Sequence, residues 1–289
     1  MRVSGFTIVR NAIKFDYPVV EAIQSVLPIC DEFVVLIGNS DDDTVELIRR
    51  IDSPKIKIHH SIWDDSLRKG GRVLAIETDK AFQLIDKKSD WAFYIQADEV
   101  LHEEYHGSLI NDMQTYLSNP KVEGILLNYK HFYGSYDFVG DSRRWYRKEV
   151  RIVRNNAAVT SFRDAQGFRY NDRLIRVKAS KAYMYHYGWV KSPEKQQEKQ
   201  KAFHKLWHDD EWVEQKTGNN LEFDYGEIDS LVLFNGSHPL PMQKRIMEKN
   251  WHFDFDPTKK NFGLKNWCLH QMECLTGWRI GEYKNYRLV

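Results

Sequence analysis

The chain has 289 residues, and its 42 Lys and Arg residues balance 41 Asp and Glu residues to a formal charge of +1, which excludes the basic excess of a nucleic-acid-binding protein. A chain of this length can bury a sizeable core, either as one large domain or as a domain with an appendage. Its three cysteines form no CxxC pair, which argues against a disulfide framework or a zinc site, and no stretch approaches the roughly 20 apolar residues of a membrane span.

The first half of the chain alternates between strand-like and helix-like segments. Apolar runs predict strands at residues 6–9, 33–37 and 91–95, with a shorter alternating strand at 55–59. Apolar residues at helical spacing predict helices at 19–27, at 41–51 and after Gly70 and Gly71. Strands that are apolar on both faces and alternate with helices predict a parallel sheet covered on each side.

The pattern changes after Glu99. We expect a helix at residues 109–117 and then strands of a mixed or antiparallel region at 124–129, 150–153, 174–177 and 182–187. Ser192, followed by Pro193 and Glu194, is a helix start for a segment that runs toward Trp207 and is rich in Lys and Gln, so we expect one face of it to be solvated. The sequence thus divides into an α/β domain over residues 1–191 and a helical, aromatic-rich extension over 192–289 that packs on it.

Polar residues follow two of the predicted strands at the edge where parallel sheets bind ligands, at residues 38–43 and 96–99. Asp98 and Glu99 end a buried strand, and a hard divalent cation typically takes one or two such carboxylates together with substrate phosphates. The alternative is that the two acids only cap the next segment. No GxGxxG follows the first strand and no GxxxxGK[ST] occurs, which argues against a dinucleotide oxidoreductase or a P-loop protein.

Four motifs in order resemble the GT-A fold glycosyltransferases of family 2, in particular bacterial lipopolysaccharide-core-type members. They are TIVRNA (residues 7–12), DEFVVLIGNSDDDT (31–44), QADE (96–99) and KEVRIVRN (148–155), and the resemblance covers roughly residues 4 to 190. It implies a GT-A (nucleotide-diphospho-sugar transferase) Rossmann-like mixed sheet. It also implies an inverting glycosyltransferase of cell-envelope polysaccharide biosynthesis, which moves a sugar from a nucleotide-sugar donor to a hydroxyl of a glycan or lipid-linked acceptor.

The same resemblance assigns a nucleotide and metal site. Asp98 would bind Mg²⁺ or Mn²⁺, and His186, at the end of a strand, would be a second ligand unless it is a packed structural residue. Nucleotide contacts are expected from Thr7, Val9, Asn11, Gly38, Asn39, Asp42, Arg72, Gln96 and Ala97, with Lys69 beside Arg72 as a second charge at a helix N-terminus. The sequence departs from the family where Gln96 replaces the first Asp of Asp-x-Asp. Glutamine carries no charge, so metal affinity should fall.

Asp164 is the best candidate for the general base that inversion requires. It follows the KEVRIVRN strand by about a dozen residues, as an acid does in the family, whereas Glu149 and Asp141 are poorer fits. The alternative is an ordinary loop aspartate paired with Arg163 or Arg169. A basic cluster at residues 143–148 could meet phosphates of a donor or acceptor, or be a solvated face.

Other readings remain open. A nucleotidyltransferase would need a Gly- and Arg-rich triphosphate loop, which is absent after residues 7–10, and a non-catalytic nucleotide- or sugar-binding protein is favoured by Gln96.

The apolar run at residues 5–9 is too short for a signal peptide, so we expect a cytoplasmic protein. Residues 273–289 mix aromatic and basic side chains, which suits peripheral contact with the inner face of a membrane, core packing or a dimer contact equally well.

Overall fold

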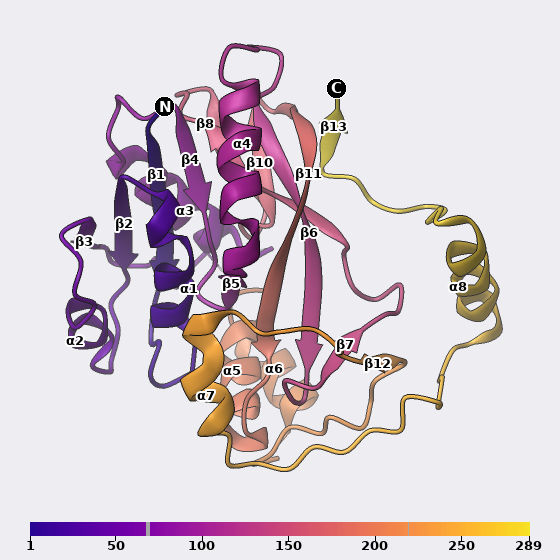
Figure 1. Cartoon of the computed structure of the whole chain (residues 1–289). Coiled ribbons are helices and arrows are strands. Elements are labelled where there is room, and N and C mark those ends of the chain that lie inside the picture. The colour runs from indigo at the N-terminus through magenta and orange to yellow at the C-terminus, as the bar shows by residue number, and fades with distance from the viewer. Residues whose placement is uncertain (68–69, 219) are drawn as a thin grey trace.

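The computed structural model describes residues 1–67, 70–218 and 220–289, and its central feature is one mixed β-sheet with helices on both faces (Figure 1). Within those ranges the sheet has 13 strands, and its main path runs β3-β2-β1-β4-β8-β6-β11-β10-β9. The strands are β1 (Val3–Val9), β2 (Glu32–Ile37), β3 (Ile56–His60), β4 (Trp91–Tyr94), β5 (Glu99–Leu101), β6 (Gly124–Tyr133), β7 (Phe138–Gly140), β8 (Lys148–Arg154), β9 (Val159–Phe162), β10 (Gly167–Tyr170), β11 (Arg173–Trp189), β12 (Leu231–Leu233) and β13 (Tyr286–Leu288).

The sheet is parallel in its first half and mixed in its second. Strands β3, β2, β1 and β4 pair in parallel, whereas β8 is antiparallel to both β4 and β6. Strand β11 is parallel to β6 and antiparallel to β10. This is the Rossmann-like mixed sheet that the sequence predicts, so the expected α/β fold class is confirmed.

The predicted helices are present with small differences at their ends. The α-helices are α1 (Val19–Val26), α2 (Thr44–Arg49), α3 (Arg72–Leu84), α4 (His106–Tyr116), α5 (Pro193–His204), α6 (Asp210–Thr217), α7 (Gln243–Met247) and α8 (Leu264–Thr276). Ser192 caps α5, because its hydroxyl oxygen accepts a hydrogen bond from the backbone N–H of Lys195. Gly71 precedes α3 in a left-handed conformation, at φ 64°, which glycine adopts without steric cost.

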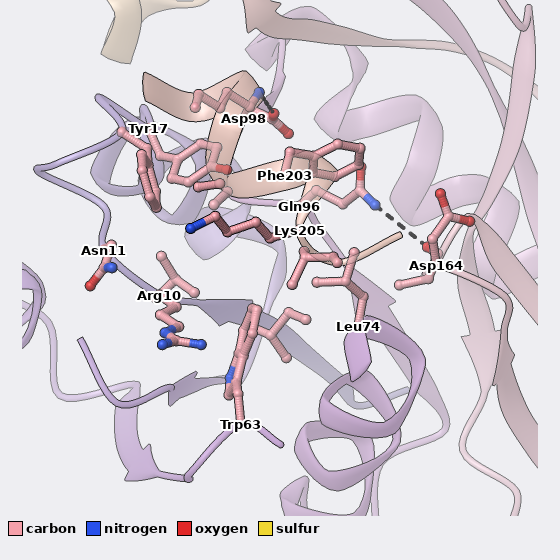
Figure 2. Close-up of a pocket in the computed structure, with 18 of the residues that line it drawn as sticks. Arg10, Asn11, Tyr17, Trp63, Leu74, Gln96, Asp98, Asp164, Phe203 and Lys205 are labelled. Carbon is pink, nitrogen blue, oxygen red and sulfur yellow. Dashed lines mark hydrogen bonds and ion pairs between the residues drawn. The ribbon is translucent and has the colours of Figure 1, made fainter. Parts of the chain in front are cut away.

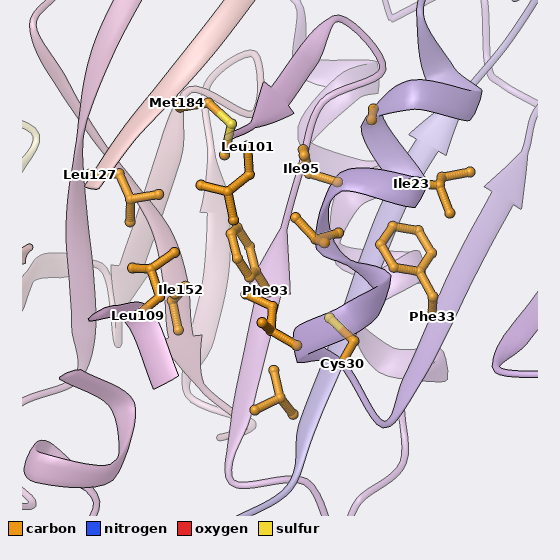
Figure 3. Packing of buried hydrophobic residues seen from close by; sticks show 14 of the residues in the cluster. Ile23, Cys30, Phe33, Phe93, Ile95, Leu101, Leu109, Leu127, Ile152 and Met184 are labelled. Carbon is orange, nitrogen blue, oxygen red and sulfur yellow. The ribbon is translucent and has the colours of Figure 1, made fainter. Parts of the chain in front are cut away.

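Apolar side chains fill both faces of the parallel strands, as their unbroken apolar sequences require. On β2, Phe33, Val35 and Ile37 belong to the cluster beneath α1 and α4, whereas Val34 and Leu36 belong to the cluster on the α3 side. Figure 3 shows the first cluster, which extends from Phe33 and Ile23 across the sheet toward Leu127 and Ile152. The runs that are buried on both faces determine where each strand ends. They therefore also determine which residues follow the strand at the edge of the sheet.

The two strands predicted at residues 174–177 and 182–187 are parts of the single long strand β11. The pairing of β11 with β6 is irregular between Ala179 and Tyr183. There the side-chain amide of Asn128 donates hydrogen bonds of 3.2 Å to the carbonyl oxygens of Ser180 and Ala182. A neighbouring side chain thus satisfies the backbone of the bulge, and a strand that looked interrupted by polar residues continues.

The segment after residue 191 contacts the first part of the chain at several places. Strand β12 pairs with β7 and β13 pairs with β11, whereas α8 stands away from the sheet (Figure 1) and has no buried residue. The boundary at residue 191 remains a prediction. Across the described ranges no helix is both long enough and apolar enough to cross a membrane.

Candidate active site

A cavity of about 810 Å³ opens at the carboxyl ends of β1 and β4, where α5 covers it (Figure 2). Its wall combines the end of β1, the turn after β4, the β9–β10 turn, the end of β11 and residues of α5. Seven predicted site residues lie in this wall, namely Val9, Asn11, Gln96, Ala97, Asp98, Asp164 and His186. The fold therefore brings together residues that are up to about 180 positions apart along the chain.

The other predicted nucleotide contacts do not line this cavity. Thr7 is buried inside β1, opposite Val35 of β2. Asp42 accepts hydrogen bonds from the backbone N–H groups of Thr44 (3.0 Å) and Lys14 (2.8 Å), so its carboxylate holds a loop and the start of α2 together.

Gly38 and Asn39 lie behind Trp63 rather than at the cavity. A Cβ atom on Gly38 would come within 2.5 Å of the indole nitrogen of Trp63, and Asn39 Oδ1 accepts a hydrogen bond of 3.1 Å from the Trp63 backbone N–H. Trp63 itself lines the cavity in their place. Arg72 is exposed at the first residue of α3, away from the cavity wall, and Lys69 lies outside the described residues.

The Asp98 carboxylate lies between a lysine of α5 and a histidine of β11. Its Oδ2 lies 3.0 Å from the ammonium nitrogen of Lys199, and its Oδ1 lies 3.7 Å from Nε2 of His186. Burial alone would raise the pKa of Asp98, but Lys199, His186 and Lys191 together lower it below its ordinary value. Asp98 is therefore an ionised carboxylate inside the protein with an ammonium group as its main partner.

Glu99, the second acid of the motif, is on the other side of the backbone and does not line the cavity. Its carboxylate makes a two-point ion pair with the guanidinium of Arg151, at 2.8 and 2.9 Å, and accepts a hydrogen bond of 2.7 Å from the Tyr129 hydroxyl. Glu99 and Arg151 are both buried. This pair fastens the turn after β4 to β8, so Glu99 has a structural role.

Gln96 connects the motif to the turn that carries Asp164. Its backbone N–H donates to Glu99 Oε2 at 3.1 Å, and its side-chain amide makes a long hydrogen bond of 3.5 Å to the carbonyl oxygen of Ala165 (Figure 2). The sequence hypothesis for this residue assigned it to contact with the nucleotide. In the structure it faces the β9–β10 turn.

Asp164 lies in a tight turn between β9 and β10, and the residues on either side of it, Arg163 and Ala165, have positive φ angles of 57° and 62°. Non-glycine residues rarely adopt this conformation, and such strained positions cluster at functional sites. The Cβ atom of Asp164 packs against Gly71, where an added Cβ would come within 2.7 Å of it. The turn thus presents the aspartate to the cavity in a fixed position.

Within the described ranges, Asp164 Oδ1 is buried without a hydrogen-bond partner, and no ion pair joins Asp164 to Arg163 or Arg169. Burial raises the pKa of Asp164. A carboxylate with an unused oxygen and a raised pKa is suited to accept a proton from a bound hydroxyl.

The two weaker candidates for the general base lie outside the cavity wall. Asp141 is paired with Lys260 at 2.9 Å. Glu149 is buried, and desolvation raises its pKa to about 8.

His186 is half-buried and lies against the buried imidazole of His131. Nε2 of His131 lies 2.8 Å from the carbonyl oxygen of Tyr146, so it carries a proton, and the two Nδ1 atoms of His131 and His186 lie 3.3 Å apart. Burial lowers the pKa of both residues. A neutral His186 then donates from Nδ1 to His131 and leaves its Nε2 unprotonated beside Asp98.

The residues around Asp98 do not fit the divalent cation that the resemblance implies. In the described part of the chain no third His, Cys, Asp or Glu joins Asp98 and His186 in a cluster that could hold a metal, so a cation there would depend on substrate phosphates for its other ligands. Lys199 and Lys191 also place two ammonium groups near Asp98, which would repel a dication. The Asp98 carboxylate is thus better suited to its ion pair with the Lys199 ammonium group than to a divalent cation.

Several residues of the wall were not expected from the sequence. Lys199 is the most important. One face of this helix was expected to be solvated, but the sequence did not indicate that the buried residues of α5 would be Gln196, Gln197 and Lys199. Because α5 has no apolar stripe, any face of it that packs on the protein must bury polar side chains. This feature of the sequence could have indicated that a lysine or glutamine of α5 is buried. Figure 2 also shows Lys205 and Arg10 directed into the cavity.

No family model matches the chain, and no curated protein matches it. Among solved structures, S. aureus TarS is 18% identical with a TM-score of 0.40, and the match covers 70% of this chain and 39% of that one. A 4-diphosphocytidyl-2C-methyl-D-erythritol synthase from Anaerococcus prevotii is 14% identical (TM-score 0.40, 66% and 91% covered). Glucosyl-3-phosphoglycerate synthase from Mycobacterium tuberculosis, in complex with Mn²⁺, UDP and phosphoglyceric acid, is 20% identical (TM-score 0.29, 46% and 43% covered). Each score is below 0.5, so nothing about activity follows from these likenesses.

Proposed function

We propose that the protein is a glycosyltransferase that moves a sugar from a nucleotide-sugar donor to an acceptor hydroxyl. The observation that carries the proposal is that Asp98 and Asp164 belong to one cavity at the ligand-binding edge of the sheet, and that Asp164 Oδ1 accepts no hydrogen bond from the residues that the structure describes. A volume of about 810 Å³ lies within the roughly 300–1,000 Å³ of small-molecule sites.

The donor would occupy the cavity from the end of β1 toward β11. The nucleoside would lie by Asn11 and Trp63, where the Arg10 guanidinium, paired with Asp65 at 2.6 Å, is 5.7 Å from the indole ring centre and offers a planar surface. The diphosphate would lie near Asp98. The sugar would then face Tyr146 and Trp189, aromatic rings that also line the cavity and are suited to contact a sugar ring.

Asp164 would act as the general base of an inverting transfer. The acceptor oxygen attacks the anomeric carbon while its proton passes to the Asp164 carboxylate, and the bond from that carbon to the diphosphate oxygen breaks with its electron pair on the oxygen. The unused Oδ1 and the raised pKa of Asp164 support this assignment. Mg²⁺ or Mn²⁺ remains a prediction of the resemblance and has no part in this scheme.

A lipid-linked acceptor and contact with a membrane surface form a finer part of the proposal. Helix α8 and its flanks expose Leu264 (81%), Leu275 (85%) and Trp278 (64%), an apolar surface of the kind that interfacial helices insert between headgroups. Sedimentation with anionic vesicles should therefore be lost in the Leu275→Asp, Trp278→Asp double variant. Equal sedimentation of both proteins would refute the membrane contact, as would its absence in the parent chain. The cytoplasmic location stays a prediction.

The test of the proposed function is nucleotide release from a panel of UDP-, GDP- and CMP-sugars. We expect turnover with one donor class, and a loss of about a hundredfold or more in Asp164→Asn, since general bases contribute roughly that much. Asp52→Asn, at an exposed aspartate away from the cavity, is the matched control. Nucleotide binding without turnover would favour the non-catalytic binding protein, and pyrophosphate release from nucleoside triphosphates would favour the nucleotidyltransferase.

A further inference from the structure

The Lys199 side chain has hydrogen-bonding capacity left for a ligand. Its ammonium nitrogen donates to Asp98 Oδ2 at 3.0 Å and to the carbonyl oxygen of Gly188 at 2.8 Å. A lysine ammonium has three donors, so one N–H remains. Lys199 is among the residues that line the cavity.

Lys199 is also unusually buried for a lysine, with 8% of its surface exposed. Taking an ammonium group out of water is costly, and Asp98 offsets only part of that cost. The Lys199 ammonium group has a second cationic side chain, that of Lys191, close to it rather than a second carboxylate. Lys191 is buried, donates to the Asp16 carbonyl oxygen at 2.6 Å, and shares the ring of Tyr17 with Lys199, each at 5.0 Å from its centre.

Where the motif would place a metal, the charge of Asp98 is therefore already balanced by Lys199, and Lys191 lies close by. Burial and the neighbouring Lys199 lower the pKa of Lys191 to about 7. Lys205, at the other side of the cavity, forms no hydrogen bond or ion pair through its side chain with the residues described in ranges 1–67, 70–218 and 220–289, and Figure 2 shows it directed inward. Lys199 and Lys205 thus offer cationic groups to an anion inside the cavity.

We infer that Lys199 is the cation that binds the donor diphosphate and stabilises it as a leaving group, in place of a divalent metal ion. The inference rests on the proposed function. When the bond between the anomeric carbon and the diphosphate oxygen breaks, the electron pair stays on that oxygen, and the remaining Lys199 N–H donates a hydrogen bond to the diphosphate. Lys199 keeps its proton throughout. Asp98 is a positioning residue that holds the ammonium group charged and in place.

The first experiment measures binding of UDP, GDP and CDP to the full chain by calorimetry, in excess EDTA and in excess Mn²⁺. We expect one diphosphate to bind with affinities that agree within about twofold in the two conditions. Sugar transfer should likewise survive EDTA. Binding or turnover that disappears in EDTA and returns with Mn²⁺ would overturn the inference while leaving the proposed function intact. Failure of every nucleotide to bind in both conditions would refute the proposed function itself, and the inference with it.

The second experiment replaces the ammonium group. Lys199→Met should weaken diphosphate binding about ten- to a hundredfold, the usual value of a charge-assisted hydrogen bond, and Lys199→Arg should restore most of it. Lys195→Met is the matched control on the same helix, because Lys195 is half-buried, does not line the cavity and pairs with Glu198 at 3.1 Å. Unchanged binding in Lys199→Met would contradict the inference. If that variant does not fold, Asp98→Asn combined with Lys199→Met removes both buried charges, and the EDTA comparison on the parent chain decides in any case.

Discussion

The Lys199 ammonium group and the Asp98 carboxylate, 101 positions apart in the chain, form an ion pair of 3.0 Å that joins helix α5 to the turn after β4. Gly188 supplies the second acceptor for the same ammonium group. Helix α5, which covers the cavity, is thus held in place by Asp98, the residue that the motif would assign as a metal ligand. Binding at the cavity and the position of α5 are therefore coupled.

Gly188→Ala should disrupt this arrangement. An added Cβ would lie 2.7 Å from both Asp98 Oδ2 and the His186 ring, so the ion pair has to shift. We expect diphosphate affinity and turnover to fall about tenfold or more, since displacements of an ångström can cost still larger factors. Gly107→Ala is the control, because nothing lies within 4 Å of its added Cβ and alanine favours the helix. Calorimetry of both variants checks the prediction, and equal affinities would contradict it.

The Glu99–Arg151 pair should contribute to stability rather than to ligand binding. Arg151→Met leaves the Glu99 carboxylate buried with only the Tyr129 hydroxyl and a backbone N–H as partners. Removal of one partner of a buried pair costs about 3–5 kcal/mol, and we expect that loss in the free energy of unfolding from urea titration. Replacement of both charges, with Glu99→Gln added, should recover part of it. A loss below about 1 kcal/mol in the single variant would show that the pair is not structural.

The strand ends could be predicted from the sequence, but the partners of the residues that follow them could not. Phe33 to Ile37 and Trp91 to Ile95 are apolar on both faces, which fixes them as buried strands and fixes Asp98 at the ligand-binding edge. Asp98 lies in the turn after β4, whereas Glu99 begins β5, and this change of backbone conformation separates the two neighbouring carboxylates. The sequence alone did not show where the turn would end, so it did not show that Glu99 leaves the site.

Lys199 and Trp63 mark the limit of such reasoning. Lys199 is on a helix without an apolar stripe, so the sequence of the helix does not indicate which face is buried. That face is determined by the contacts of Lys199 with Asp98 and Gly188, which belong to other elements of the fold. Trp63 is in a loop, where periodicity carries no information, yet its ring covers Gly38 and displaces the predicted nucleotide contacts from the cavity.

Glu149 should make the stability of the protein depend on pH. Burial raises the folded-state pKa of this carboxyl to about 8 from an ordinary value near 4.5, so the folded state holds the proton more tightly. Ionisation of this buried carboxyl lowers the free energy of unfolding. That loss is absent below the ordinary pKa, grows as pH rises and reaches its full size near pH 8. Glu149→Gln should therefore stabilise the protein by about 2–4 kcal/mol at pH 8 and by little at pH 4.5.

Thermal unfolding of Glu149→Gln at the two pH values checks this sign. The exposed Glu227→Gln is the matched control and should behave like the parent chain at both. A gain for Glu149→Gln that is larger at pH 4.5 than at pH 8 would contradict the buried, neutral carboxyl.

Asp164 should set the acid limb of the pH–rate profile. Only its ionised form accepts the acceptor proton, so kcat/KM should rise as pH increases through the pKa of Asp164. Burial raises that pKa, which places the limb above the value of about 4 for an exposed aspartate. Asp164→Asn should keep a low rate without this limb, because no titrating base remains, while circular dichroism confirms that both proteins stay folded across the range. A parent profile that is flat above pH 4, or an Asn variant with an unchanged limb, would show that another group accepts the proton.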